Sequence, residues 1–402
     1  FKSVYWLIAA AKNDTRSALF ETSIAALQAL NLPLAHIEEI LVTAISRLLA
    51  VAGAALLLAA GAGCAPDVVS ETISPLDGPR IVYAVENTGG QVNTLLLAPD
   101  GSLSVLGTVG TDAGPIGITI EPSHRYVYVA CEEGGSIDQF IVNDDGTLLA
   151  NGALSWGAST SYVVASPKGG LVYASDNNCC SGVSVGDFGI QSDGSLVGLS
   201  AGIYLNDNMD GIIVDPSSTH VYVQRSGDTI MRYTLAAGVL TAQATWPAGT
   251  TGNGTLSFLA MHPSGNYLYV SSGNSGTKIA QFAVDTGLTA LSPATVSAGA
   301  QPTGILVDPT GSYLYAANSQ SASVSQYTIN VSDGTLSPMS PATVAADFSP
   351  NYMAITPNGK YLLVTNSNDT ISRYAIGAGG ALTQLPGFAV PGASFLQGIV
   401  IW

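Results

Sequence analysis

The sequence predicts an all-β fold, a seven-bladed β-propeller with four-stranded blades, because one pattern of strands and turns recurs seven times between residue 80 and the C-terminus. The pattern is clearest in GILVDPTGSYLYAANSQSASVSQYTINVSDGTL, from Gly304 to Leu336. One position marks every repeat and recurs at intervals of 45 to 49 residues: Tyr83, Tyr128, Tyr173, Tyr222, Tyr269, Tyr315 and, with leucine in its place, Leu363. No helical periodicity intervenes, so we expect each repeat to form one blade.

The turns support the same fold class independently. Asp-Gly pairs occupy one place in four of the repeats, at residues 100–101, 145–146, 193–194 and 333–334. Asp-Gly between two strands is a strong hairpin signal, so these pairs predict tight turns within the blades. A calcium loop is disfavoured, since the turns lack the regular string of oxygen ligands of an EF-hand.

The order of the strands predicts how the ring closes. The first repeat begins with its second strand at residues 81–85, and the chain stops after an opening strand, GIVIW, at residues 398–402. We therefore expect these two segments to pair, which removes the two exposed sheet edges that an open array would leave.

The N-terminal part differs in composition from the repeats. We expect residues 75–402 to form the propeller, 65–74 a short linker and 42–64 an export signal. The segment from Leu48 to Cys64 is apolar and rich in small residues, and it is shorter than most membrane-spanning helices. Residues 1–41 are interpreted as an upstream, non-native segment, with an authentic helical hairpin as the alternative. Cys64 resembles the lipidated cysteine of bacterial lipoproteins, although Gly61 departs from the usual leucine and ordinary signal cleavage also fits. An exported protein is expected, either periplasmic, anchored to the outer membrane or displayed at the cell surface.

The charge of the chain limits its possible binding partners, and its cysteines allow a disulfide. The formal net charge of -16 argues against nucleic acid, which is bound by clustered Lys and Arg. We expect a monomer that meets a membrane only through its N-terminal lipid or signal. Cys131 and the Cys179-Cys180 pair lie in matching places of neighbouring repeats, which allows a disulfide in an oxidising compartment.

Two segments of the chain resemble a known family. DPTGSYLYAANSQSASVSQYTINVSDGTL and HPSGNYLYVSSGNSGTKIAQFAVDTGL are similar to the lactonase-like seven-bladed propellers, which include 6-phosphogluconolactonase-type proteins and the related YVTN repeats. The resemblance implies that any chemistry takes place at the central mouth, where the loops entering the blades meet the loops after the second strands. The resemblance implies that family members use His, Arg and Glu there, within short motifs such as PRH before the opening strand and NE after the second strand. This chain departs from both patterns, since its blade-entry loops contain no histidine.

The candidate catalytic residues are therefore sought in the loops after the second strands. Glu132 or Asp176 could act as a general base, with Arg225 as the electrophile that stabilises a developing oxyanion. The candidate ligand-binding residues of the same loops are Glu86, Asn87, Glu133, Asn177, Asn318 and Asn366. The alternative is that these side chains only cap loop backbone at a solvated rim. No cofactor is required, but the carboxylates allow a divalent cation, Ca²⁺ or Mg²⁺, at the mouth.

Other polar and aromatic residues have a structural interpretation. Trp156 and Tyr162 could form an aromatic platform for a sugar, or could pack between blades. The Gln or Arg before each third-strand aromatic, as in Gln139 and Gln326, recurs too regularly to be a site and is expected to be part of the blade. His124, His220 and His262 fall at the opposite rim, where we expect surface or turn packing.

Two functions follow. The first is a binding propeller of the cell envelope that holds a small carbohydrate, a peptide or a protein at its acidic mouth. The alternative is a lactonase acting on a sugar lactone, with a carboxylate base and an arginine electrophile. A propeller scaffold does not choose between them.

Overall fold

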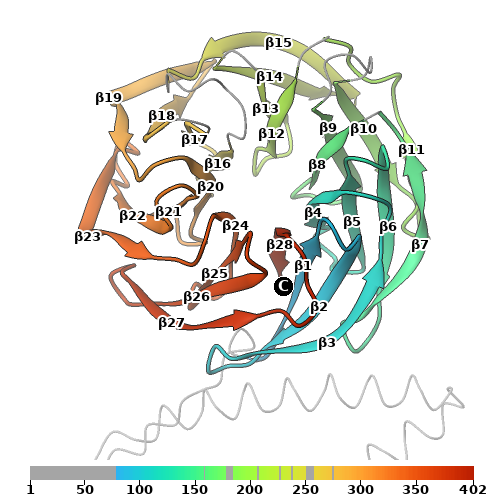
Figure 1. Ribbon diagram of the computed structural model, residues 1–402. Coiled ribbons are helices and arrows are strands. Elements are labelled where there is room, and N and C mark those ends of the chain that lie inside the picture. The colour runs from blue at the N-terminus through green and yellow to red at the C-terminus, as the bar shows by residue number, and fades with distance from the viewer. Residues whose placement is uncertain are drawn as a thin grey trace, which may run out of the picture. The chain divides into compact units, whose positions relative to one another are not determined.

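In the computed structural model, the described part of the chain folds into seven four-stranded antiparallel sheets arranged in a ring (Figure 1). The structure describes residues 78–157, 159–177, 184–205, 208–225, 228–236, 239–249, 258–273 and 276–402. The ring lies in a unit that spans residues 73–402. The predicted segments 1–41, 42–64 and 65–74, with Cys64, fall outside the described residues, as do Cys179 and Cys180.

Each blade runs from an inner strand, beside the ring axis, to an outer strand. In this order, blade 1 is β28 (Leu396–Ile401), β1 (Arg80–Glu86), β2 (Gln91–Leu97) and β3 (Leu103–Gly110), and blade 2 is β4 (Pro115–Ile120), β5 (Tyr126–Cys131), β6 (Ser136–Val142) and β7 (Leu148–Ser155). Blade 3 is β8 (Thr160–Ala165), β9 (Leu171–Asp176), β10 (Val185–Ile190) and β11 (Leu196–Gly198), and blade 4 is β12 (Met209–Val214), β13 (His220–Arg225), β14 (Thr229–Ala236) and β15 (Val239–Pro247). Blade 5 is β16 (Leu259–Met261), β17 (Tyr267–Ser271), β18 (Lys278–Val284) and β19 (Leu288–Ser297). Blade 6 is β20 (Pro302–Val307), β21 (Tyr313–Asn318), β22 (Ser323–Ile329) and β23 (Leu336–Ala345), and blade 7 is β24 (Pro350–Ile355), β25 (Tyr361–Asn366), β26 (Thr370–Ile376) and β27 (Leu382–Ala389).

The two ends of the repeat region close the ring, as the sequence predicted. β28 pairs antiparallel with β1, with Tyr83 opposite Val400 and Ala84 opposite Ile399. Figure 1 shows the C-terminal strand beside the first strand of the ring. The first blade is thus built from both ends of the repeat region, which leaves neither β1 nor β28 as a free edge.

The repeated tyrosines are bonded to the glycine-containing turns of the blades that follow them. The tyrosine of one blade is fully buried, and its hydroxyl donates to the glycine carbonyl of the turn in the next blade. Among the described residues, four such bonds are present: Tyr83 to Gly146 at 2.7 Å, Tyr128 to Gly194 at 2.9 Å, Tyr269 to Gly334 at 2.7 Å and, in the Gly379-Gly380 turn, Tyr315 to Gly380 at 2.6 Å. Each is a buried bond between blades, which explains why both residue types recur with the same period.

The glutamine before the third-strand aromatic makes a second bond between blades. Gln326 accepts from the Leu382 N–H of the next blade at 2.9 Å and donates to the Pro341 carbonyl of its own blade at 2.7 Å. Gln139 and Gln281 accept in the same way from Leu196 and Leu336. The prediction that these residues belong to the blade structure is confirmed.

Candidate functional site

Seven inner strands line the ring axis, and they begin at the rim where the blade-entry loops meet the loops after the second strands. This rim is called the mouth. One inner-strand position, three residues into most of these strands, alternates in chain order between glycine and an aromatic residue: Gly117, Tyr162, Gly211, Phe258, Gly304, Tyr352 and Gly398. Three aromatic side chains are therefore placed at one level of the axis.

These three rings meet at the axis and form what is called the aromatic floor. Phe258 lies in an edge-to-face arrangement with Tyr162, at 5.5 Å between ring centroids, and with Tyr352, at 5.0 Å. Tyr162 and Tyr352 also lie close enough for each phenol to affect the pKa of the other. The residues come from blades 3, 5 and 7, so contact among them requires that the rings reach across the axis. Tyr162 is buried, whereas Phe258 and Tyr352 are half-buried. The edge-to-face geometry is the one that aromatic clusters prefer.

The glycines at the same level let neighbouring inner strands approach closely. A Cβ on Gly304 would lie 2.2 Å from the carbonyl oxygen of Asn351, and one on Gly398 would lie 2.4 Å from that of Ile116. Such distances leave no room for a side chain. The alternation of glycine and aromatic residue is thus a steric requirement of the narrow axis.

Hydroxyl side chains of the second strands hold the aromatic positions. Ser271 accepts from the Phe258 N–H at 2.9 Å and donates to the Thr303 carbonyl of the next blade at 2.9 Å. Thr365 accepts from the Tyr352 N–H at 3.3 Å and donates to the Gln397 carbonyl at 2.7 Å. These bonds tie two of the floor residues to two blades each, so the floor is preorganised.

Two carboxylates lie close enough to the floor to act on its phenols. Burial raises the pKa of Tyr162 well above its usual value, and the neighbouring Tyr352 and the negative charges of Asp210 and Glu132 raise it further. Burial also raises the pKa of Tyr352, again with contributions from Glu132 and Asp210. Both phenols therefore remain protonated at neutral pH and can donate hydrogen bonds.

Two of the predicted catalytic residues meet at Ser159, in the loop that enters blade 3. Glu132 accepts from the Ser159 hydroxyl at 3.1 Å and from the Ser161 hydroxyl at 3.4 Å. Asp176 is fully buried and accepts from the Ser159 N–H at 3.1 Å. Asp176 thus fixes the loop backbone, whereas the half-buried Glu132 carboxylate lies over it, next to the floor.

Arg225, the predicted electrophile, ends β13 opposite Met209 of β12. Its positive charge acts on the phenol of Tyr233, in the third strand of the same blade. Glu133 is exposed in the loop after β5, and the Asn177 N–H donates to the Ser159 carbonyl at 2.9 Å.

The remaining predicted ligand-binding residues make bonds within or between the blade loops. The buried Glu86 accepts from Gln91 at 2.7 Å in its own blade. Asn318 donates to Ser325 at 2.9 Å, and Asn366 donates to Ser372 at 3.0 Å. Asn87 connects three segments, because its side chain donates to the Pro115 carbonyl at 3.3 Å and its N–H to the Phe395 carbonyl at 3.0 Å.

Trp156 and Tyr162, predicted as a platform for a sugar or as packing between blades, both pack against other aromatic rings. Trp156 packs edge-to-face on Phe188 at 5.5 Å and belongs to the core between blades 2 and 3. Tyr162 is part of the floor. Cys131 is a buried free thiol, and its predicted partners Cys179 and Cys180 lie outside the described residues.

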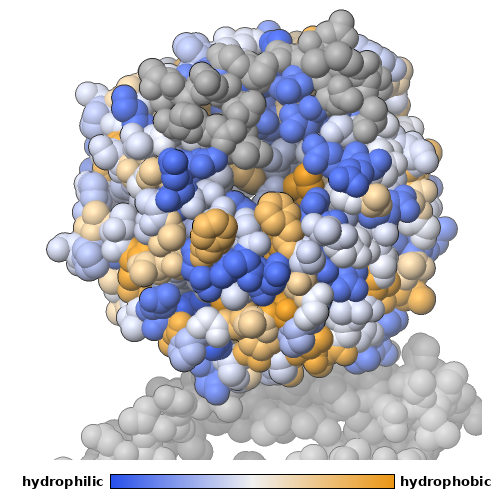
Figure 2. Space-filling view, viewed as in Figure 1, coloured by the Kyte–Doolittle hydropathy of each residue, from blue (hydrophilic) through white to orange (hydrophobic). Residues whose placement is uncertain are grey.

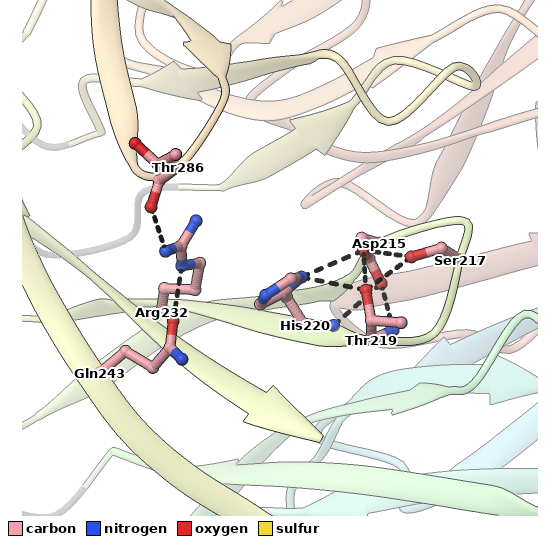
Figure 3. Close-up of polar contacts among 7 residues, drawn as sticks. All are labelled: Asp215, Ser217, Thr219, His220, Arg232, Gln243 and Thr286. Carbon is pink, nitrogen blue, oxygen red and sulfur yellow. Dashed lines mark hydrogen bonds and ion pairs between the residues drawn. The ribbon is translucent and has the colours of Figure 1, made fainter. Parts of the chain in front are cut away.

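The histidines lie in turns at the opposite rim, as predicted. Asp215 accepts from the Ser217 hydroxyl at 2.6 Å and from the Thr219 and His220 N–H groups at 2.7 and 3.0 Å, and the His220 ring lies 3.4 Å from the same carboxylate (Figure 3). His262 bonds to Ser264 and to the Gly311 carbonyl. These contacts are those of turn packing.

Phe258, Tyr352 and Asp210 were not singled out from the sequence. The signal that could have found them is the alternation of glycine with aromatic residues once the seven inner strands are aligned. Within the ranges that the structure describes, no group of three or more His, Cys, Asp or Glu side chains is placed to hold a metal ion. Those ranges also contain no helix long and apolar enough to cross a membrane.

Comparison with known proteins gives one family match. Residues 229–349 match the family described as Lactonase, 7-bladed beta-propeller. No curated protein sequence matches the chain.

Solved structures give the same fold. A putative 6-phosphogluconolactonase from Bacteroides fragilis NCTC 9343 superposes with a TM-score of 0.71 at 19% identity, covering 82% of this chain and 99% of that one. The periplasmic gluconolactonase of Pseudomonas aeruginosa gives a TM-score of 0.67 at 19% identity, covering 80% and 99%. AztD from Citrobacter koseri gives 0.53 at 14% identity, covering 81% and 98%. The chain is therefore a seven-bladed β-propeller, and within it residues 229–349 match the lactonase family.

Proposed function

We propose that the protein binds a small carbohydrate, either neutral or bearing an amino group, at its acidic mouth. The observation that carries this proposal is the aromatic floor of Tyr162, Phe258 and Tyr352 with the carboxylates of Glu132 and Asp210 acting on its phenols. A sugar presents C–H faces that pack on aromatic rings and hydroxyls that hydrogen-bond to carboxylates and phenols.

The charges at the mouth favour this class of ligand over anionic sugars. Glu132 and Asp210 lie beside the floor, Glu133 is exposed nearby, and the chain carries a formal net charge of -16. A carboxylate or phosphate on the ligand would be repelled, whereas an ammonium group would be attracted. Glu132 is the acceptor best placed for a ligand, because the hydroxyls of Ser159 and Ser161 orient it from one side.

Isothermal titration tests the proposal with D-glucose, D-glucosamine and D-gluconate as ligands. We expect D-glucosamine and D-glucose to bind, D-gluconate to bind far more weakly, and Glu132→Gln to weaken D-glucosamine binding about tenfold or more, the size expected for a charged hydrogen-bond partner. Glu133→Gln is the matched control, since Glu133 is the exposed neighbour. Absence of binding by all three ligands, or equal losses in the two variants, would contradict the proposal.

A lactonase remains the alternative, and the family match over residues 229–349 favours it. Among the fold neighbours, one carries the description of a periplasmic gluconolactonase. In this chain, Glu132 could take a proton from water while a protonated phenol of the floor donates to the developing oxyanion. The test is hydrolysis of D-glucono-1,5-lactone by the unaltered protein and by Glu132→Gln, Asp176→Asn and Arg225→Ala. Turnover that these substitutions abolish would establish the enzyme; no turnover by a folded, sugar-binding protein would exclude it for this substrate.

Export, lipidation at Cys64 and a divalent cation at the mouth belong to the same proposal as predictions. Fractionation of cells that produce the protein or its Cys64→Ser variant tests the first two, since only lipidated protein should remain with the membranes. Titration with Ca²⁺ and Mg²⁺ in the presence and absence of D-glucosamine tests the third.

A further inference from the structure

Two exposed phenylalanines stand at the mouth on adjacent blades. Phe348 lies in the loop that enters blade 7 and is 68% exposed, and Phe395 lies in the loop that enters blade 1 and is 40% exposed. The face shown in Figure 2 is hollowed near its centre, and hydrophobic side chains stand among hydrophilic ones over the region of β24 and β28. Large apolar side chains kept in water at the entrance to a candidate site call for a physical explanation.

The backbone of Phe395 is held in a conformation that a bulky residue rarely adopts. Its φ is 63°, in the left-handed region, where a side chain costs free energy that glycine or asparagine would avoid. The Phe395 N–H donates to the Asp369 carboxylate at 2.5 Å, and its carbonyl accepts from the Asn87 N–H at 3.0 Å. The exposed ring is therefore presented from an anchored backbone.

Phe348 is anchored by a second carboxylate. Its N–H donates to Asp347 at 2.8 Å, and Asp347 also accepts from Asn368 and from the Thr370 hydroxyl, both at 2.9 Å. Asn368 and Asp369 are neighbours in the loop between β25 and β26. That single polar loop is thus bonded to both phenylalanine-bearing loops, which anchors the backbone of each phenylalanine.

We propose that Phe348 and Phe395 form an outer subsite for further sugar units, so that the natural ligand is an oligosaccharide that extends from the floor over blades 7 and 1. This inference rests on the proposed function of the mouth. Each ring can stack on the face of one sugar, and the amide and carboxylate of Asn368 and Asp369 offer hydrogen bonds between them. Two rings held on fixed backbone would be ready to bind without a large ordering cost.

A glycan fits these residues better than a protein does. The two phenylalanines come with the carboxylates of Asp347 and Asp369, which bond to the same loop or backbone, whereas the core of a protein interface is depleted in charge. The carboxylates of Asp347 and Asp369 also disfavour chains of uronic acids, as Glu132 and Asp210 do at the floor.

Isothermal titration with a monosaccharide and its tetramer tests the inference. The probes are D-glucosamine with its β-1,4-linked tetramer, and D-glucose with cellotetraose. We expect a tetramer to bind about tenfold more tightly than its monosaccharide, and we expect Phe348→Ala and Phe395→Asn to remove that gain while leaving the monosaccharide affinity unchanged. Asparagine is chosen at position 395 because it tolerates a positive φ, so the loop should keep its shape.

The matched control is Val331→Ala. Val331 is 78% exposed and lies in the turn between β22 and β23, at the opposite rim. This variant should bind the tetramer more tightly than the monosaccharide by the same factor as the unaltered protein. Thermal midpoints of all variants within a few degrees of the unaltered protein would show that the fold is intact.

The outcomes separate the two proposals. A monosaccharide that binds while its tetramer binds no more tightly overturns the outer subsite and leaves the floor site standing. Tetramer binding that depends on Phe348 and Phe395 without any monosaccharide binding supports the outer subsite and contradicts the inner one. Failure of every probe to bind overturns both.

Discussion

At the scale of single residues, each inner strand carries either a glycine or an aromatic residue at one level of the ring axis. Gly304 must lack a side chain because the Asn351 carbonyl occupies the space, whereas Tyr352, one blade on, fills the axis itself. Tyr162 could be picked out from the sequence because it follows a polar blade-entry loop beside Trp156. Phe258 and Tyr352 could not, since an aromatic residue in a β-strand usually signals ordinary core.

The first prediction concerns this close approach. Gly304→Ala should lower the free energy of unfolding by about 1–3 kcal/mol, because its Cβ would overlap the Asn351 carbonyl and push two inner strands apart. Urea unfolding measures the change. Gly379→Ala is the control, since a Cβ there meets nothing within 4 Å. Equal stability of the two variants would show that the inner strands can relax and that glycine is not required at this level.

At the scale of elements, the blades are joined by side chains that reach from one sheet to the next. The recurrence of Gln139, Gln281 and Gln326 was enough to predict a structural role, but the partners were not visible in the sequence, because each bond joins residues 55 to 57 positions apart. For the mouth residues, a shared place in the repeat did not show whether their side chains were available to a ligand. Glu86, Asn318 and Asn366 share one place in the repeat, and hydrogen bonds within their own blades occupy their side chains.

The second prediction compares two tyrosines at the same place in their third strands. The buried hydroxyl of Tyr327 donates to the Ser297 carbonyl at 2.6 Å, whereas the buried hydroxyl of Tyr233 finds no partner among the residues that the structure describes. Tyr327→Phe should therefore lower the free energy of unfolding by about 1 kcal/mol, and Tyr233→Phe should leave it unchanged or raise it slightly. Chemical denaturation of both variants checks this. An equal loss in both would contradict the role given to the bond between blades.

The third prediction concerns the turn around Asp215 (Figure 3). Burial raises the pKa of this carboxyl, but hydrogen bonds from Ser217, His220 and Thr219 outweigh burial and hold the pKa below its usual value. The unfolded chain therefore binds more protons in the acid range, so the stabilisation is present above the ordinary carboxyl pKa and is lost as pH falls through the folded value.

Asp215→Asn should accordingly destabilise the protein by about 1 kcal/mol at pH 7, and the difference should shrink below about pH 4. Urea unfolding at several pH values measures it. Asp144→Asn, at an exposed position of the turn between β6 and β7, is the control and should show little change at any pH. A deficit that stays constant down to pH 3 would mean that the charge of Asp215 does not carry the effect.

At the scale of the whole molecule, the fold was largely determined by the period and order of the repeats. The blade count and the pairing of the C-terminal strand with the first strand both follow from the sequence, because a seven-fold repeat with one displaced strand has a single way to close. The candidate site was only partly predictable. Glu132 was identified from its loop, but its association with Tyr162 and Tyr352 requires residues from blades 2, 3 and 7 to converge at the axis, and the repeat pattern does not show which side chains reach it.

The most direct test of the central claim, that the aromatic floor and its carboxylates form a sugar-binding site, is isothermal titration of D-glucosamine into Tyr352→Ala. The control is Tyr204→Ala, since Tyr204 is 59% exposed and its ring takes no part in the ring contacts of the floor. Tyr352→Phe serves as a second variant that keeps the ring but loses the hydroxyl. The account predicts binding by the unaltered protein and the control, and a loss of about tenfold or more in Tyr352→Ala. Undiminished binding by a folded Tyr352→Ala would place the ligand away from the floor and contradict the account.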